Sequence, residues 1–274
     1  WGSNVPLTRT PDAHFLTEVR YKGTKVVSVS PDYAESTTSS DAWLNVKAGT
    51  DAALAMAMGH VILKEYYIDK ETPYFKEYAK EFTDMPFLVR VEDINGTVQP
   101  GRFLNAKDLG RKEEGADFQM VLIDETTNEI VVPNGTMGER HTNPQKWNLR
   151  LENRDTGAKI DPRLSVFDQR EDVTVVKLPY FGDEEHEGVI ERAIPTITVQ
   201  TVDGPVKVTT VYDLILANYG IDRGIGGEVA TSYTDDTPYT PTWQEKITGV
   251  KADIAIATAR EFADNAEKTK GRSM

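Results

Sequence analysis

The pattern of apolar and polar positions divides the chain into three parts. In the first part, residues 1–86, short apolar runs at 25–30 and 42–46 predict strands, and the segments 10–22 and 51–67 predict helices. Thr10 and Thr50 stand where residues that cap a helix are expected. Strands that alternate with helices at this spacing are typical of a parallel sheet covered by helices. We therefore predict an α/β fold with a Rossmann-like parallel sheet flanked by helices.

The middle part, residues 87–210, has short β-branched runs separated by turn dipeptides. Asn95-Gly96 lies between two such runs and is typical of a two-residue hairpin, and Asp203-Gly204 repeats the signal. This part is predicted to be a β-rich insertion in the α/β domain. Helix patterns return at 211–219 and 251–266, so residues 211–274 are predicted to be a helical return to the α/β domain.

The first candidate site is the loop that precedes the first predicted helix. Gly2 permits a pyrophosphate to approach the backbone N–H groups, and Ser3 and Asn4 offer a hydroxyl and an amide as donors. The same residues are also ordinary turn formers. The loop alone is therefore a weak signal for a phosphate-bearing ligand.

The second candidate site lies at the carboxyl end of the first predicted strand, residues 25–30, just after Val29. Ser30, Pro31 and Asp32 come next, and an acidic residue at this place commonly accepts hydrogen bonds from a ribose hydroxyl. The alternative is that Pro31 only ends the strand and that Asp32 is solvated.

The third candidate site is Gly49-Thr50-Asp51, at the junction of the second predicted strand with a helix. An aspartate here could accept two N–H bonds from the edge of a guanine base. The alternative is structural, because threonine caps helices and aspartate suits the positive start of a helix. All three sites fall on one edge of the predicted sheet, the edge at which open α/β folds bind ligands.

Composition removes several classes of function. The chain has 31 Lys and Arg against 44 Asp and Glu, a formal charge of −13, and no basic block, which argues against nucleic acid as a partner. It has no cysteine, and the spacing of its histidines (His14, His60, His141 and His186) does not suggest a metal site. No arrangement typical of nucleophilic or paired-carboxylate catalysis is present. We therefore assign no catalytic and no metal-binding residue.

Both ends of the sequence look cut. Trp1 and the residues after it are typical of a turn that follows a strand, and Gly271 to Met274 follow a helix pattern where a further strand is expected. We therefore expect the chain to be an internal piece of a larger cytoplasmic enzyme.

Several longer motifs resemble one family. They are WGSNVP at 1–6, TRTPDAHF at 8–15, TEVRYKGTK at 17–25, PDY at 31–33, GTDAAL at 49–54, TVYDL at 210–214, YTP at 239–241, Trp243, ITGV at 247–250 and AREFA at 259–263. These motifs resemble the catalytic alpha subunits of membrane-bound respiratory nitrate reductases, a branch of the molybdopterin oxidoreductase family. The resemblance covers nearly the whole chain and is weakest at about 97–195.

The resemblance implies a cofactor, molybdenum-bis(molybdopterin guanine dinucleotide), and a [4Fe–4S] cluster in the full subunit. It places Ser3 and Asn4 near the phosphates of one dinucleotide, the segment 29–32 beside its guanosine, and Asp51 on its guanine. The ligands of the cluster and of molybdenum are expected in parts of the subunit that precede Trp1.

The resemblance also implies that the full enzyme reduces nitrate to nitrite on the cytoplasmic side of a bacterial membrane. Electrons from quinol would arrive through a haem-containing membrane gamma subunit and an iron–sulfur beta subunit. The isolated chain is expected to be inactive. Two alternatives stay open: a reductase of the same superfamily for another oxyanion, such as chlorate or selenate, and a stand-alone nucleotide-binding or scaffold module.

Overall fold

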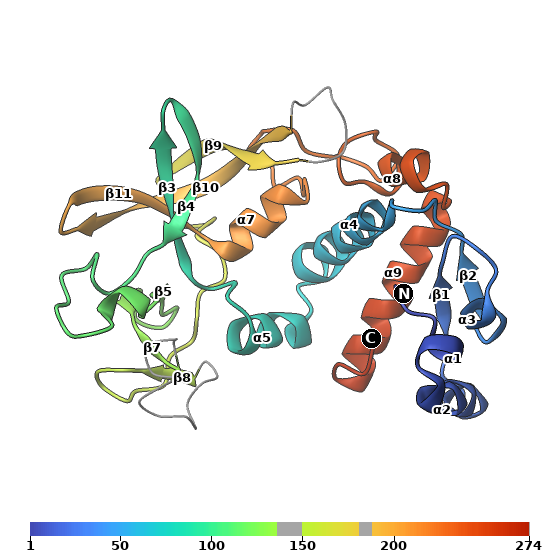
Figure 1. Ribbon diagram of the computed structural model, residues 1–274. Helices are drawn as coiled ribbons and strands as arrows, with labels where there is room; N and C mark the ends of the chain where they lie inside the picture. The colour runs from blue at the N-terminus through green and yellow to red at the C-terminus, as the bar shows by residue number, and fades with distance from the viewer. Residues whose placement is uncertain (136–149, 181–187, 274) are drawn as a thin grey trace. The chain divides into compact units, whose positions relative to one another are not determined.

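A computed structural model describes residues 1–135, 150–180 and 188–273 of the chain (Figure 1). The chain forms two compact units. Unit 1 comprises Trp1–Ile62 and Ser232–Asp264, and unit 2 comprises Leu63–Thr231 and Asn265–Met274. Unit 1 is therefore built from two stretches of chain that are separated in sequence by most of unit 2.

Unit 1 combines one pair of parallel strands with helices. The strands are β1 (Val27–Val29) and β2 (Ala42–Leu44), and Ser28 lies opposite Trp43 in their register. The helices are α1 (Val5–Thr8), α2 (Thr10–Tyr21), α3 (Glu35–Thr38), α4 (Asp51–Ile62), α8 (Pro241–Thr248) and α9 (Ala252–Thr269), of which α9 continues beyond this unit. The predicted mixture of helices and strands is confirmed.

The core of unit 1 joins both of its stretches. Its buried residues are Leu44, Val46, Leu54, Val250 and Ala255, and Val27, Val29 and Met58 pack against them. The alternating apolar positions of β1 and β2 thus bury one face against α4 and the start of α9. Within the described residues this sheet has two strands, so the larger Rossmann-like sheet stays a prediction.

Two helix starts differ from expectation. Helix α2 begins at Thr10, after Arg9 at the cap position, and the Thr10 hydroxyl donates to the Leu7 carbonyl oxygen at 3.1 Å. The cap predicted at Thr10 is therefore wrong. The Thr50 hydroxyl also turns back and donates to the Lys47 carbonyl oxygen at 2.7 Å. Threonine commonly makes such local bonds to the preceding turn, and they direct the hydroxyl away from the helix.

The helices also differ in extent from the predicted segments. The single helix expected at 51–67 is α4 followed by a π-helical segment, η1 (Leu63–Asp69). Helix α8 was not predicted, although its start carries ordinary signals. Thr240 accepts a hydrogen bond from the Trp243 N–H at 3.1 Å, and Pro241 occupies the first turn.

Unit 2 is organised around a five-stranded antiparallel sheet with the order β4-β3-β11-β10-β9. The strands are β3 (Leu88–Ile94), β4 (Thr97–Phe103), β9 (Asp172–Pro179), β10 (Val189–Thr201) and β11 (Gly204–Thr210). The hairpin predicted at Asn95-Gly96 is confirmed, because these residues connect β3 to β4 with φ values of 57° and 82°. Both values are positive, as a tight hairpin turn requires.

Shorter elements complete unit 2. They are α5 (Pro73–Phe82), η2 (Ala116–Phe118), β5 (Leu122–Ile123), β6 (Ile130–Val131), β7 (Pro133–Asn134), β8 (Arg150–Asn153) and α7 (Val211–Asn218). The core brings together buried residues from the sheet and the following loops, including Leu88, Leu104, Val121, Val166 and Val208. Helix α7 is confirmed close to its predicted bounds of 211–219.

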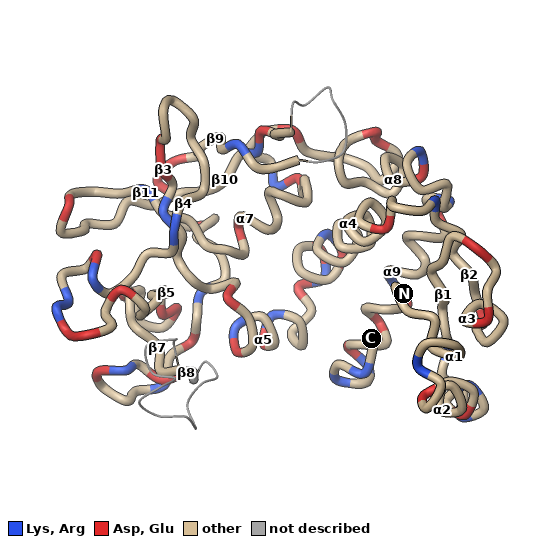
Figure 2. Tube along the Cα trace, in the orientation of Figure 1, with Lys and Arg blue, Asp and Glu red and all other residues tan. Residues whose placement is uncertain are grey.

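The antiparallel sheet falls within residues 87–210, where a β-rich insertion was expected. The division of the chain at 86/87 and 210/211 stays a prediction, and the compact units have bounds of their own. Acidic and basic residues are both spread along the described trace (Figure 2). None of the described helices has the length and the apolar character that crossing a bilayer requires.

Candidate nucleotide-binding site

A pocket of about 360 Å³ lies in unit 1 at the carboxyl end of β1. It is lined by the first loop (residues 1–5), by Leu16, by residues 26–32, by Ala34 and Ser36, and by Asp51. The size is at the lower end of the range for small-ligand sites. The pocket brings together residues from each of the three loops singled out in the sequence.

The first loop contributes open backbone and small polar side chains. Gly2 has φ 69°, and a Cβ built there would meet no atom within 4 Å. The Asn4 carbonyl oxygen accepts from the Thr8 N–H at 2.8 Å, which ties the loop to α1. The Asn4 side chain accepts from the Ser36 hydroxyl, with 3.0 Å between Ser36 Oγ and Asn4 Oδ1. Gly2, Ser3 and Asn4 all line the pocket.

The second loop continues β1. Ser30 extends the strand pairing, since its N–H donates to the Leu44 carbonyl oxygen at 3.2 Å. Its own carbonyl oxygen accepts from the Trp43 side chain, through Nε1, at 3.0 Å. The Ser30 hydroxyl also donates to Asp32 Oδ1 at 3.1 Å. Val29, Ser30, Pro31 and Asp32 all line the pocket. A fixed backbone at Ser30 thus leads into an exposed turn that carries one carboxylate.

The third loop contributes one residue to the lining. Asp51, the first residue of α4, faces the pocket, whereas Gly49 and Thr50 do not line it. Trp1 Nε1 donates to Asp51 Oδ1 at 2.6 Å, a bond between residues 50 positions apart in sequence. The binding role expected of Gly49 and Thr50 stays a prediction, and their place next to Asp51 is their link with the site.

The chemistry of the lining is acidic and otherwise neutral. Its charged side chains are Asp32 and Asp51, and no Lys or Arg lines the pocket. The remaining polar groups are hydroxyls, an amide, an indole N–H and backbone. These groups suit a ligand with two kinds of polar atom. Its N–H groups would donate to the carboxylates, and its oxygens would accept from the neutral donors. The positive start of α4 favours the negative charge of Asp51.

Reasoning from the sequence missed several lining residues, among them Trp1 and Ser36. Trp1 was noted as part of the first loop, but the candidate residues began at Gly2. Ser36 carries no signal in the sequence, because it is one polar residue in a short polar helix. Its place in the site depends on a contact with Asn4, 32 residues away.

A second cavity, of about 590 Å³, lies in unit 2. Its two most buried cations are paired with carboxylates: Arg163 with Glu125 at 2.5 Å and Arg223 with Asp213 at 2.7 Å. Burial raises the pKa of Tyr67 to about 12 and raises the pKa of Tyr212 as well. These phenols therefore stay protonated at neutral pH. The two buried arginines at this cavity are thus already neutralised by carboxylates.

Two of the four histidines lie in described residues. His14 is exposed on α2, and its ring centroid lies 3.9 Å from that of Phe15, while His60 is buried on α4. His141 and His186 lie outside the described residues. Within residues 1–135, 150–180 and 188–273, no group of three His, Cys, Asp or Glu side chains is placed to hold a metal ion.

Known proteins resemble this chain over its whole length. It is 53% identical to the nitrate reductase alpha chain of Bacillus subtilis over 274 residues, which is all of this chain and 22% of that protein. It is 48% identical to the respiratory nitrate reductase 1 alpha chain of Escherichia coli, again over all of this chain and 23% of that protein. The perchlorate reductase subunit alpha of Dechloromonas aromatica is 39% identical over 140 residues, or 51% of this chain.

The chain thus spans about a fifth to a quarter of the length of the nitrate reductase relatives. The resemblance to nitrate reductase alpha subunits that the sequence motifs indicated is confirmed by these identities. A family model described as molybdopterin oxidoreductase matches residues 1–260. Because this match covers nearly all of the 274 residues, the chain belongs to the molybdopterin oxidoreductase family.

Proposed function

We propose that this chain binds the guanosine end of a molybdopterin guanine dinucleotide in the catalytic subunit of a bacterial respiratory nitrate reductase. The observation that carries the proposal is the position of Asp51. Its carboxylate lines the same pocket as the first loop and the turn at 30–32. The carboxylate would bind the base, the first loop would bind a phosphate, and the turn would bind a ribose. Membership of the family supports a molybdenum–pterin cofactor.

Asp51 has the acceptor capacity that guanine requires. A carboxylate offers about four lone-pair sites, and the guanine edge presents two N–H donors. Trp1 occupies one site on Oδ1. Oδ2 accepts no hydrogen bond in the described part of the chain, and the second lone pair of Oδ1 is also open. Two open acceptor sites on a residue that lines the pocket are sufficient for a pair of N–H bonds from one base.

The first loop and the turn after β1 supply groups for the rest of the nucleotide. At Gly2 no side chain separates the backbone from the pocket, and Ser3 and Asn4 bring neutral donors to phosphate oxygens. Ser30 and Asp32 are placed to contact ribose hydroxyls. The pocket is large enough for a nucleoside portion, and we propose that the pterin and the metal lie outside it.

The proposed contribution of this chain is to bind and orient the cofactor. When bound, the cofactor supplies the two-electron redox chemistry that reduces nitrate to nitrite. The carboxylate of Asp51 fixes the base, and neutral donors hold the phosphates. The chain has no cysteine, so we propose that the ligands of a [4Fe–4S] cluster lie elsewhere in the subunit. We propose the same for the ligand of molybdenum, as the resemblance implies.

The full enzyme is proposed to act on the cytoplasmic side of the membrane. Quinol-derived electrons would reach this subunit through an iron–sulfur beta subunit and a haem-containing membrane gamma subunit. A substrate such as chlorate or perchlorate is the alternative. Identities near 50% over the whole chain favour nitrate over perchlorate, for which the similarity covers half of the chain. Rates of the purified enzyme with nitrate, chlorate, selenate and perchlorate separate these substrates.

Substitution of Asp51 in the full subunit tests the proposal. Asp51→Ala is expected to lower the molybdenum and guanine content per subunit several-fold, because the base loses its acceptor. Activity per molybdenum and the KM for nitrate should stay close to wild type. The matched control is Asp12→Ala, which removes another first-turn aspartate that does not line the pocket. Full cofactor content in Asp51→Ala would show that Asp51 serves only the helix start.

A further inference from the structure

The Ser36 side chain of helix α3 is hydrogen-bonded to the first loop. The Ser36 hydroxyl donates to Asn4 Oδ1 at 3.0 Å and lies 3.4 Å from the Ser3 carbonyl oxygen. Both Ser36 and Asn4 are partly buried and line the pocket. The contact joins two segments that are 32 residues apart in sequence.

The direction of this hydroxyl differs from that of its neighbours. Thr38 Oγ1 donates to the Glu35 carbonyl oxygen, and Ser40 Oγ donates to the Thr37 carbonyl oxygen, each at 2.7 Å. Such local bonds are the usual choice of hydroxyls in and after a short helix. Ser36 instead donates to another segment. Its hydroxyl therefore serves the first loop and not its own helix.

Helix α3 is itself anchored to the sheet. Thr37 is 3% exposed, and its hydroxyl lies 3.3 Å from that of Ser28, a buried residue in the middle of β1. Thr37 Oγ1 also reaches the Asp32 carbonyl oxygen at 3.5 Å. Ser36 therefore extends from a fixed base. Thr37 thus fixes α3 to β1, and Ser36 on the same helix contacts Asn4 in the first loop.

The contact determines which end of the Asn4 amide is open. An amide has one oxygen acceptor and one NH₂ donor, and a hydroxyl that donates to the oxygen occupies that acceptor. The NH₂ group of Asn4 remains available to a ligand in the pocket. A phosphate or ribose oxygen can accept a hydrogen bond from this NH₂ group. In the opposite orientation, the amide oxygen would face the ligand oxygen, and neither could donate.

We propose that Ser36 is a positioning residue for the cofactor site: it holds the Asn4 amide with its NH₂ group toward the nucleotide. The inference rests on the proposed function of the pocket. Trp1, Gly2 and Ser3 are exposed, so the first loop has few packing contacts to fix it. A loop that is ordered before the ligand arrives binds more tightly, because less conformational entropy is lost on binding.

The test uses the full subunit, assembled and purified, with molybdenum and guanine content as the first readout. Ser36→Ala is expected to lower retained cofactor about threefold to tenfold after incubation under mildly dissociating conditions, the effect of one lost hydrogen bond. Ser36→Thr keeps the hydroxyl and should restore most of the content. The matched control is Thr38→Ala, which removes a hydroxyl of the same helix that donates to the Glu35 carbonyl oxygen.

A double-mutant cycle shows whether Ser36 acts through Asn4. Asn4→Ala alone should lower cofactor content. Adding Ser36→Ala should lower it little further, because both substitutions remove the same contact, the oriented Asn4 amide. Asn4→Asp tests the orientation independently of Ser36. It keeps the acceptor for Ser36 but replaces the NH₂ group by an oxygen, and it should lower cofactor content at least as much as Asn4→Ala.

The outcomes separate the inference from the function on which it rests. If Asn4→Ala and Asp51→Ala lower cofactor content but Ser36→Ala behaves like Thr38→Ala, the positioning role is wrong and the proposed function stands. Full additivity of Ser36→Ala and Asn4→Ala, or wild-type content in Asn4→Asp, would also overturn the positioning role. Wild-type content in both Asn4→Ala and Asp51→Ala would overturn the proposed function itself.

Discussion

Carboxylates in the two units have different surroundings. In unit 1, Asp51 accepts one side-chain hydrogen bond, from Trp1, and Asp32 accepts one, from Ser30; both line the pocket. In unit 2, Asp108 and Asp213 are 5% and 0% exposed, and each accepts several bonds. A buried carboxylate needs such partners, whereas a carboxylate beside a cavity keeps acceptor sites for a ligand.

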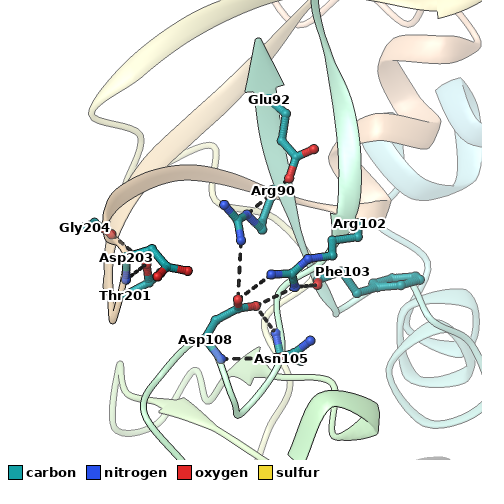
Figure 3. A network of polar contacts seen from close by, with 9 residues as sticks. All are labelled: Arg90, Glu92, Arg102, Phe103, Asn105, Asp108, Thr201, Asp203 and Gly204. Atoms are coloured by element: carbon teal, nitrogen blue, oxygen red, sulfur yellow. Dashed lines mark hydrogen bonds and ion pairs between the residues drawn. The ribbon is translucent and has the colours of Figure 1, made fainter. Parts of the chain in front are cut away.

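Asp108 shows the saturated arrangement (Figure 3). Arg102 donates through Nη1 at 2.7 Å and Nη2 at 2.5 Å, Arg90 donates at 3.3 Å, and the Asn105 N–H donates at 3.0 Å. Burial raises the pKa of Asp108, but the bonds from Arg102 and Asn105 lower it more, so the pKa lies below its usual 3.8. This carboxylate fastens the turn at 105–108 to the β3–β4 hairpin.

Asp213 is saturated in the same way at the start of α7. It accepts from Arg223 at 2.7 Å, from the Ser165 hydroxyl at 2.6 Å, from the Val166 N–H at 2.9 Å and from the Thr210 hydroxyl at 2.9 Å. The comparison teaches that partners, more than charge, distinguish a structural carboxylate from one that is open to a ligand. Substitution of Asp108 or Asp213 should therefore lower stability, whereas substitution of Asp51 should lower cofactor content and leave stability nearly unchanged.

The largest effect is expected at Asp213. Asp213→Ala leaves Arg223 buried without its carboxylate, which costs about 3–5 kcal/mol in a buried pair. Hydrogen exchange of the α7 amides in the full subunit measures this loss locally. Asp203→Ala, in the exposed turn between β10 and β11, is the control and should change protection by less than about 0.5 kcal/mol. If the α7 amides of Asp213→Ala exchanged as slowly as in wild type, the distinction between the buried carboxylates and those that line the pocket would be wrong.

A smaller effect, dependent on pH, is expected at Asp108. Its pKa is depressed in the folded state, so its ionised form adds stability above the unfolded pKa of 3.8, and this stability is lost as pH falls through the folded pKa. Asp108→Asn should cost about 2 kcal/mol at pH 7. The difference from wild type, measured as exchange of β3 and β4 amides, should shrink from about pH 5 downward. A difference that grows at low pH would contradict the saturated arrangement.

The smallest effect is expected at two glycines that differ in their relation to the pocket. Gly2 (φ 69°) and Gly49 (φ 81°) both have open space where a Cβ would stand. Alanine at either position costs about 1 kcal/mol of backbone strain. Only Gly2 lines the pocket, so Gly2→Ala should lower cofactor content and Gly49→Ala should not. Equal content in the two variants would mean that the first loop does not contact the cofactor.

Local chemistry explains which parts of the fold could be predicted from the sequence. Asn95-Gly96 specifies a hairpin because few residue pairs accept two positive φ values. Thr10 and Thr240 are both followed by proline, yet only Thr240 caps a helix. Their difference lies in the direction of one hydroxyl, which the preceding turn determines. Capping signals therefore locate a helix start but do not fix the hydrogen bond made there.

The site was predictable only to the extent that strand ends define it. Asp32 and Asp51 each follow a short apolar run, so their place at one edge could be inferred from the order of strands and helices. Ser36 could not be inferred, because its contact with Asn4 depends on the position of α3, which Thr37 anchors to β1. The bond between Trp1 and Asp51 likewise joins distant parts of the chain. Contacts of this kind arise from packing and leave no local pattern.

All residues that line the pocket lie between positions 1 and 51, before the chain enters unit 2 at Leu63. The lining of this pocket is thus encoded in one short stretch of sequence. Loops of unit 2 can be lengthened, shortened or replaced without changing any residue that lines the pocket. An engineer who exchanges such loops between relatives should find the proposed nucleotide site unchanged, because residues 1–51 supply its whole lining.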